Sequence, residues 1–463
     1  MSACGSAGAH YAKIERALRA GDASKAVSII TKSEGAYGNR SAALYLMDKG
    51  MIQHLAGHYT ESNQSLARAE ELTEDLYTRR ILSEVEAFLT TDNALPYEGE
   101  DFEKVLLNVM MALNYVHLGL WDDALVEARK VDHKLNVLAE RNNRKMAYSK
   151  DTFARYLSGI LYEAVGDLSN AFVAYRLAFE AFRQSRTVYG TAVPDLLRQD
   201  LLRVSEALGL NQEHNEYRQV FPGIAWQPEG AARGLGELVF ITYAGRAPMK
   251  RDVFVDVPFS VGALNVVLAT KGLSRHDTVN HRAAESVLYG LTGRVVRLAV
   301  PQFVPRRSAL AYTEAIAVSG EGSHTARSVL MEDITTIAVK DLEDRLLRTT
   351  AKAVARSAWK YALAESVRVG VRQAVGKDGG ALAGAVAGAV ARIAAIASEE
   401  ADKRSWVTLP DQIHIGRVLL PPGTYDVEFR HVGKFGGVVE RQTVRGVTVA
   451  DGQKRFLSTR VLQ

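Results

Sequence analysis

Two patterns of hydrophobic and polar positions divide the chain. Residues 10–215 carry apolar positions at helical spacing, whereas after residue 230 apolar and polar residues alternate with a period of two. The first pattern predicts helices and the second predicts strands. We therefore expect an α+β protein, with a helical repeat domain over 10–223 and a β-rich, sandwich-like domain over 230–333 and 405–463.

The helical half contains a recurring unit built around a turn glycine. These glycines are Gly21, Gly57, Gly119 and Gly166, and the clearest copy surrounds Gly166. Glycine permits a tight connection between helices, and small residues at the crossing let two helices approach closely. The unit resembles the tetratricopeptide (TPR) repeat. The glycine spacing is irregular, which predicts additional helices between the repeats.

In TPR arrays the first helix of each pair lines a concave groove. The repeat register places a mostly apolar set of residues on this face, namely Met47, Met51, His54, Val109, Leu113, Val116, Tyr156, Ile160 and Glu163. If the face is exposed, it would bind a helix or an apolar peptide of a partner protein. If it is covered, it would pack against another part of the same chain. The pattern leaves both arrangements open.

A helical insert over 334–404 interrupts the β-rich half. Within it Gly380, Gly384 and Gly388 recur every four residues and form a smooth stripe that lets another backbone approach closely. The uncharged run 379–391 is too short to span a bilayer as a helix. We consider three roles for this helical hairpin: packing within the chain, contact between copies in a homo-oligomer, and contact with a membrane.

Charge and residue types exclude several classes of function. Lys and Arg number 57 and Asp and Glu number 53, so the net charge is 57 − 53 = +4, without the basic excess of a nucleic-acid binder. A single cysteine, Cys4, excludes an intramolecular disulfide and multi-cysteine metal sites. His54 and His58 lack the glutamate of a zinc-binding motif. We predict no metal, cofactor or catalytic residue, and a protein that is not an enzyme.

The start of the chain predicts a lipid anchor. Ser2-Ala3-Cys4 resembles the end of a bacterial lipoprotein signal, with Met1 at the position of the usual leucine. Acyl chains on Cys4 would attach a water-facing body to a bilayer. The signal itself would lie upstream of this chain, and residues 1–9 would act as anchor and linker.

Four phrases together carry a family resemblance, and they occupy residues 96–103, 124–129, 156–163 and 400–410. They resemble an uncharacterised family of bacterial envelope lipoproteins with TPR-like helices and a C-terminal β-rich region. The resemblance implies an outer-membrane lipoprotein on the periplasmic face, because glycine rather than aspartate follows Cys4. It implies no enzymatic activity.

The phrases also contain candidate structural residues. Glu100 and Glu103 stand at a predicted helix start, where carboxylates cap free amides. Glu400 and Arg404 have the spacing of a helical ion pair. We expect Arg404 and Trp406 to anchor the returning chain between the two domains.

These observations favour a scaffold that binds envelope proteins. The sequence leaves two alternatives. One is a homo-oligomeric ring or secretion component assembled through the glycine stripe, and the other is an enzyme with an unrecognised site in the β-rich domain.

Overall fold

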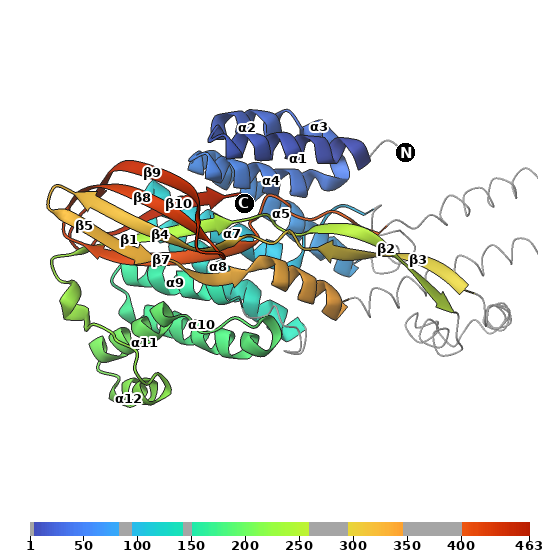
Figure 1. Cartoon of the computed structure of the whole chain (residues 1–463). Coiled ribbons are helices and arrows are strands. Elements are labelled where there is room, and N and C mark those ends of the chain that lie inside the picture. Colours follow the sequence, from blue (N-terminus) through green and yellow to red (C-terminus); the bar gives the residue numbers. More distant parts are fainter. Residues whose placement is uncertain (1–3, 83–94, 142–150, 259–294, 346–400) are drawn as a thin grey trace, which may run out of the picture.

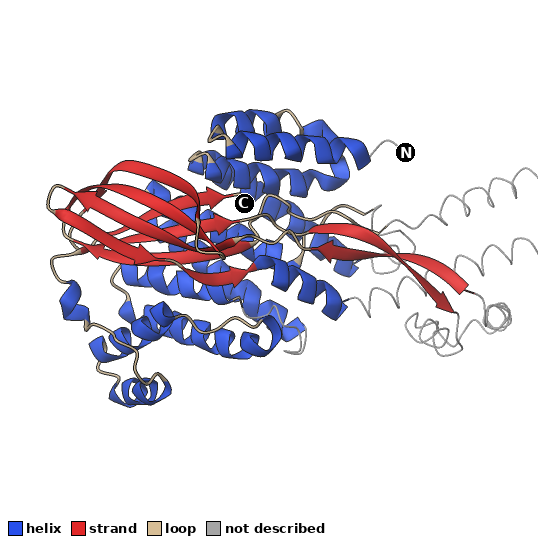
Figure 2. Ribbon diagram, viewed as in Figure 1, coloured by secondary structure: helices blue, strands red, loops and turns tan. Residues whose placement is uncertain are grey.

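The computed structural model describes residues 4–82, 95–141, 151–258, 295–345 and 401–463. Helices form the first half and strands dominate the second, as the α+β prediction requires (Figures 1 and 2). The helices are α1 (Cys4–Arg19), α2 (Ala23–Thr31), α3 (Glu34–Tyr37), α4 (Ala42–Leu55), α5 (Tyr59–Leu82), α7 (Asp101–Leu118), α8 (Trp121–Arg141), α9 (Thr152–Ala164), α10 (Leu168–Tyr189), α11 (Asp195–Ala207) and α12 (Asn211–Val220).

The helices form TPR-like pairs. Successive partners α1 and α2, α4 and α5, α7 and α8, and α9 and α10 pack together, and the turn between them contains Gly21, Gly57, Gly119 or Gly166 at φ values of 72°, 77°, 75° and 80°. Only glycine adopts this left-handed conformation without strain, so the predicted turns are confirmed. Helix α1 begins at Cys4, six residues before the predicted start of the helical repeat domain at residue 10.

The strands form two four-stranded sheets and one ribbon. Sheet one has the order β10-β1-β7-β6, sheet two has the order β5-β4-β8-β9, and β2 pairs only with β3 among the described strands. The bounds are β1 (Gly236–Ala244), β2 (Met249–Pro258), β3 (Val295–Val304), β4 (Leu310–Ser319), β5 (Gly322–Arg327), β6 (Val329–Asp333), β7 (Gln412–Leu420), β8 (Gly423–Gly433), β9 (Val438–Val449) and β10 (Lys454–Val461).

Strand β1 shows that the fold has three layers. Leu238 and Phe240 belong to the core between the two sheets. Val239, Ile241 and Tyr243 alternate with them and belong to the core shared with the helices. Since successive side chains of a strand point to opposite faces, sheet one is covered by helices on one face and by sheet two on the other (Figure 1). The helical and β-rich regions thus share one core.

Two elements lie at one end of this body. They are the β2–β3 ribbon, which leaves the body, and the helix that begins at Ile334 and is described to Arg345, whose Ile334, Ile337 and Ala338 are buried in the shared core (Figure 1). The predicted helical insert therefore does start at residue 334, but residues 401–404 at its other end are not helical. Gly380, Gly384 and Gly388 lie outside the described residues, so their predicted role stays a prediction.

Candidate functional site

The predicted groove residues are buried inside the chain. Each of the apolar members and His54 is at most 6% exposed, and the Glu163 side chain is 6% exposed. They fill the contact between the helices and sheet one, which is the second of the two arrangements that the sequence left open. In this conformation they line no open groove. The buried residues are Met47, Met51, His54, Val109, Leu113, Val116, Tyr156, Ile160 and Glu163.

His54 shows how the helices meet the sheet. Its Nδ1 lies 2.6 Å from Asn114 Oδ1 on α7, and its Nε2 lies 3.0 Å from the Tyr243 hydroxyl on β1. Burial lowers the pKa of His54 to about 4, although the Asn114 hydrogen bond opposes this shift. The ring is therefore neutral at pH 7 and joins helix to strand as a polar core residue.

A buried ionic network joins the same two layers further along, and Arg417 on β7 is its centre. Arg417 Nε lies 2.6 Å from Glu237 Oε1 on β1, Nη1 lies 2.6 Å from Asp200 Oδ2 on α11, and Nη2 lies 3.2 Å from Glu163 Oε1 on α9. Arg203 and Lys454 complete the network. Three cations thus face three carboxylates whose side chains, like theirs, are at most 14% exposed, and Arg203 also pairs with the more exposed Glu229 at the edge of the network.

A second cluster brings together two of the phrases that carry the family resemblance. Glu103 accepts hydrogen bonds from the backbone N–H of Trp406, at 2.7 Å, and from that of Glu100, at 2.9 Å. The Tyr97 hydroxyl also donates to Glu103. Burial and the neighbouring charge of Glu100 raise the pKa of Glu103 to about 7. The predicted capping role of Glu100 and Glu103 is confirmed.

Glu100 also pairs with both the β2–β3 ribbon and the helix that begins at Ile334. Its carboxylate pairs with Lys250 on the ribbon and with Arg345 on the helix that begins at Ile334. Arg345 Nη2 in addition lies 2.6 Å from Asp341 Oδ2. We call Glu100, Lys250, Asp341 and Arg345 the ionic joint. Sequence reasoning singled out Glu100 and missed its partners, which lie at least 150 residues away from it in the chain.

Arg404 and Trp406 lie where the chain returns to the body. Arg404 donates through Nη1 to the Arg40 carbonyl and through Nη2 to the Leu95 carbonyl, both at 3.0 Å, and pairs with Asp402 at 2.7 Å. Trp406 is 1% exposed. Both residues thus contact the helical region from the β-rich half. The predicted partner Glu400 lies outside the described residues.

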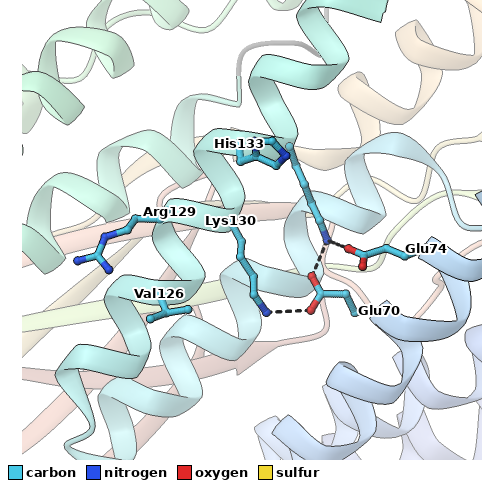
Figure 3. Close-up of a pocket in the computed structure, with 7 residues that line it drawn as sticks. Glu70, Glu74, Val126, Arg129, Lys130 and His133 are labelled. Carbon is cyan, nitrogen blue, oxygen red and sulfur yellow. Dashed lines mark hydrogen bonds and ion pairs between the residues drawn. The ribbon is translucent and has the colours of Figure 1, made fainter. Parts of the chain in front are cut away.

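An open pocket of 420 Å³ lies between α5 and α8 (Figure 3). Lys134 Nζ is 2.6 Å from Glu70 Oε1, and Lys130 Nζ is 3.1 Å from Glu70 Oε2. These charges compensate one another, so we assign the pocket no ligand. None of the predicted site residues lines it; the lining residues are Glu70, Glu74, Val126, Arg129, Lys130, His133 and Lys134.

The ribbon exposes apolar side chains. Phe254 is 64% exposed and the adjacent Val255 is 40% exposed. Because successive residues of a strand point to opposite faces, both faces of the ribbon carry accessible apolar surface. The described residues contain no group of three or more potential metal ligands. No described helix is both long enough and apolar enough to cross a membrane.

Comparison with known proteins finds similarity to solved TPR-like structures that cover about half of this chain. No protein family and no curated protein matches the chain. Among solved structures, MamA from Desulfovibrio magneticus RS-1 is 13% identical, with 48% of this chain and 93% of that chain covered and a TM-score of 0.29. The apo form of RapI is 14% identical, with 48% and 55% covered and a TM-score of 0.35.

A kinesin light chain of Podospora anserina with TPR-like repeats is 11% identical, with 46% of this chain and 91% of that chain covered and a TM-score of 0.31. Similarity at these scores carries no argument about activity or partners. The TPR-like character of the helical region rests on its own helix pairs and turn glycines.

Proposed function

We propose that this chain is a bacterial outer-membrane lipoprotein on the periplasmic face, anchored through Cys4, that acts as a protein–protein interaction scaffold in envelope assembly. The location follows from the sequence resemblance and the Cys4 motif. The scaffold role has support from the folded chain as well.

The exposed ribbon is the observation that carries this proposal. A two-stranded ribbon is marginally stable by itself in water, and apolar residues on both of its faces favour a covering partner. The ionic joint fixes the base of the ribbon to the body, since Lys250 is 4% exposed and pairs with the buried Glu100. A body that holds an apolar ribbon in a fixed direction is suited to presenting it to another protein.

Partner capture from detergent-solubilised envelope tests the ribbon. Phe254 is 64% exposed, and full burial of a phenylalanine removes about 200 Å² from water, so a partner covering it gains up to about 3 kcal/mol. We expect Phe254→Ser to reduce capture by about tenfold or more. Phe435→Ser is the matched control, because Phe435 is a fully exposed phenylalanine in the turn between β8 and β9. Equal capture by both variants would contradict the ribbon as the partner site.

Membrane fractionation tests the anchor separately. A form with its signal segment, produced in a bacterial host, should sediment with outer membranes, and Cys4→Ser should release it into the periplasmic fraction. Continued membrane association of Cys4→Ser would refute the lipid anchor and leave the ribbon result unaffected.

A further inference from the structure

Three arginine side chains converge where α1 packs against the ends of β1 and β10. They are Arg246, after β1, Arg306, between β3 and β4, and Arg460, on β10. Glu15 of α1 faces them: its Oε2 lies 2.9 Å from Arg246 Nη1 and its Oε1 lies 3.5 Å from Arg306 Nη1. We call Arg246, Arg306 and Arg460 the arginine cluster. The single carboxylate of Glu15 thus pairs with two of the three guanidinium groups.

Arg460 is incompletely paired. Its Nη2 donates to the Leu409 carbonyl at 3.3 Å, while its Nε and Nη1 are buried without a hydrogen-bond acceptor in the described structure. A buried donor without an acceptor costs about 1–3 kcal/mol, and more when it is charged. The register of β1 and β10 fixes this position, because Arg460 stands opposite Tyr243 at the end of the strand pair.

Other acceptors near the cluster are already occupied. Arg306 Nε donates to the Ala247 carbonyl at 2.7 Å. Asp48, a further carboxylate of this region, accepts from Tyr11 at 2.6 Å and from Thr408 at 2.7 Å, and also from Tyr37. Among the described residues, no acceptor lies within hydrogen-bond distance of Arg460 Nε or Nη1.

The electrostatics show an excess of positive charge. Burial lowers the pKa of Arg460 to about 10; Tyr243 and Glu15 oppose this shift, and the charges of Arg306 and Arg246 add to it. Burial and Arg246 lower the pKa of Arg306 as well. Arg417 is the opposite case: burial again disfavours its charge, but Asp200 and its other carboxylates raise its pKa well above the usual value. The arginine cluster therefore lacks the counter-charge that the Arg417 network has.

We propose that the arginine cluster binds a phosphate group. Three arginines against Glu15 leave a surplus of two positive charges, and a phosphate monoester carries a charge of about −1.5 to −2 at pH 7. The planar guanidinium fork matches phosphate oxygens. Arg246 is 36% exposed and Arg306 is 19% exposed, so these two side chains reach solvent, while the Nε and Nη1 atoms of Arg460 are buried. Inorganic phosphate carries the same charge as a phosphate monoester, whereas a phospholipid headgroup is a phosphodiester that carries a charge of about −1 and offers two non-bridging oxygens to the same guanidinium groups.

The test titrates inorganic phosphate into the full chain by calorimetry and follows thermal unfolding against sodium chloride at equal ionic strength. We expect saturable binding and a rise in Tm in phosphate only. Arg246→Gln should weaken binding by about tenfold, because one charge-assisted hydrogen bond is lost. Arg441→Gln is the matched control: Arg441 is 60% exposed, pairs with Glu428 on the outer face of sheet two, and should leave the phosphate response unchanged.

Arg460→Met separates binding from a structural role. The variant should unfold in chloride at the same temperature as the parent or higher, because an uncompensated buried charge is gone, and its phosphate response should be lost. If Arg460→Met does not fold, the phosphate response of Arg246→Gln tests the proposal instead. Competition by phosphatidylglycerol vesicles would assign the site to a lipid headgroup, and no competition would assign it to free phosphate. A phosphate response no larger than that of chloride, or unchanged in both variants, would overturn the proposal.

Discussion

Replacement of Arg417 by methionine is expected to destabilise the protein by about 4 kcal/mol, within the range for breaking a buried ion pair. The size of this loss in stability follows from the ion pairs that remain after Arg417 is replaced. Glu163 keeps Arg203 and Lys454, and Asp200 keeps Arg203, but Glu237 loses both of its bonds to Arg417 and keeps Lys454 alone. Most of the lost stability therefore comes from Glu237, a buried carboxylate that keeps only one of its two cationic partners.

Urea unfolding, followed by circular dichroism and by tryptophan fluorescence, to which the buried Trp406 contributes, measures this cost. Arg441→Met is the matched control, since its 2.9 Å pair with Glu428 on the surface is worth about 0–1 kcal/mol. Adding Glu237→Gln to Arg417→Met should restore part of the loss, because the unpaired charge is removed. Equal unfolding midpoints for Arg417→Met and Arg441→Met would refute the claim that this network joins helices and sheet.

Two further predictions concern packing and pH. A Cβ at Gly159 would lie 2.3 Å from the ring of the buried Tyr175, so Gly159→Ala should lower stability by about 1–3 kcal/mol, whereas Gly35→Ala, which meets nothing within 4 Å, should be neutral or stabilising in thermal unfolding. Burial raises the pKa of Asp48 to about 6, although hydrogen bonds from Tyr11 and Thr408 oppose the shift. Between about pH 4 and 6 the folded state therefore binds more protons than the unfolded state, so Asp48 makes the stability fall as pH rises through that window. Asp48→Asn should flatten the dependence of stability on pH there. An unchanged slope in the variant would contradict the raised pKa of Asp48.

Local signals predicted most of the elements. The turn glycines mark the connections within four helix pairs, and the apolar–polar alternation marks the main strands. Strand β5 (Gly322–Arg327) was not predicted, because its residues are polar and largely exposed at a sheet edge and give no alternation of buried positions.

The sequence did not decide whether the groove face of the helices is covered by the β-rich half of the chain. Strand β1 is buried along its whole length, and its sequence from Leu238 to Tyr243 is almost continuously apolar, which is typical of a strand covered on both faces. This signal favoured packing of the sheet against the helices. The partners could not be read from the sequence, because β1 pairs in parallel with β10, which lies more than 200 residues later.

Polar partners across the layers were hidden for the same reason. Glu163 was placed on the groove face, which either a partner protein or another part of the chain could cover, and it contacts Arg417 and Lys454 of the same chain. Charged residues at isolated positions give no local pattern, so only the folded chain shows that their charges compensate. The arginine cluster likewise could not be predicted from the sequence, because its three arginines are far apart in the chain and come together only in the folded protein.

Native-state hydrogen exchange under increasing urea tests the central claim most directly, namely that the TPR-like helices and sheet one form a single unit around a shared core. Amides of β1 (Gly236–Ala244) and of α9 (Thr152–Ala164) should lose protection together, with the same dependence on urea. If β1 exchanges at low urea while α9 stays protected, the helices and the sheet are separate units and the closed groove is refuted.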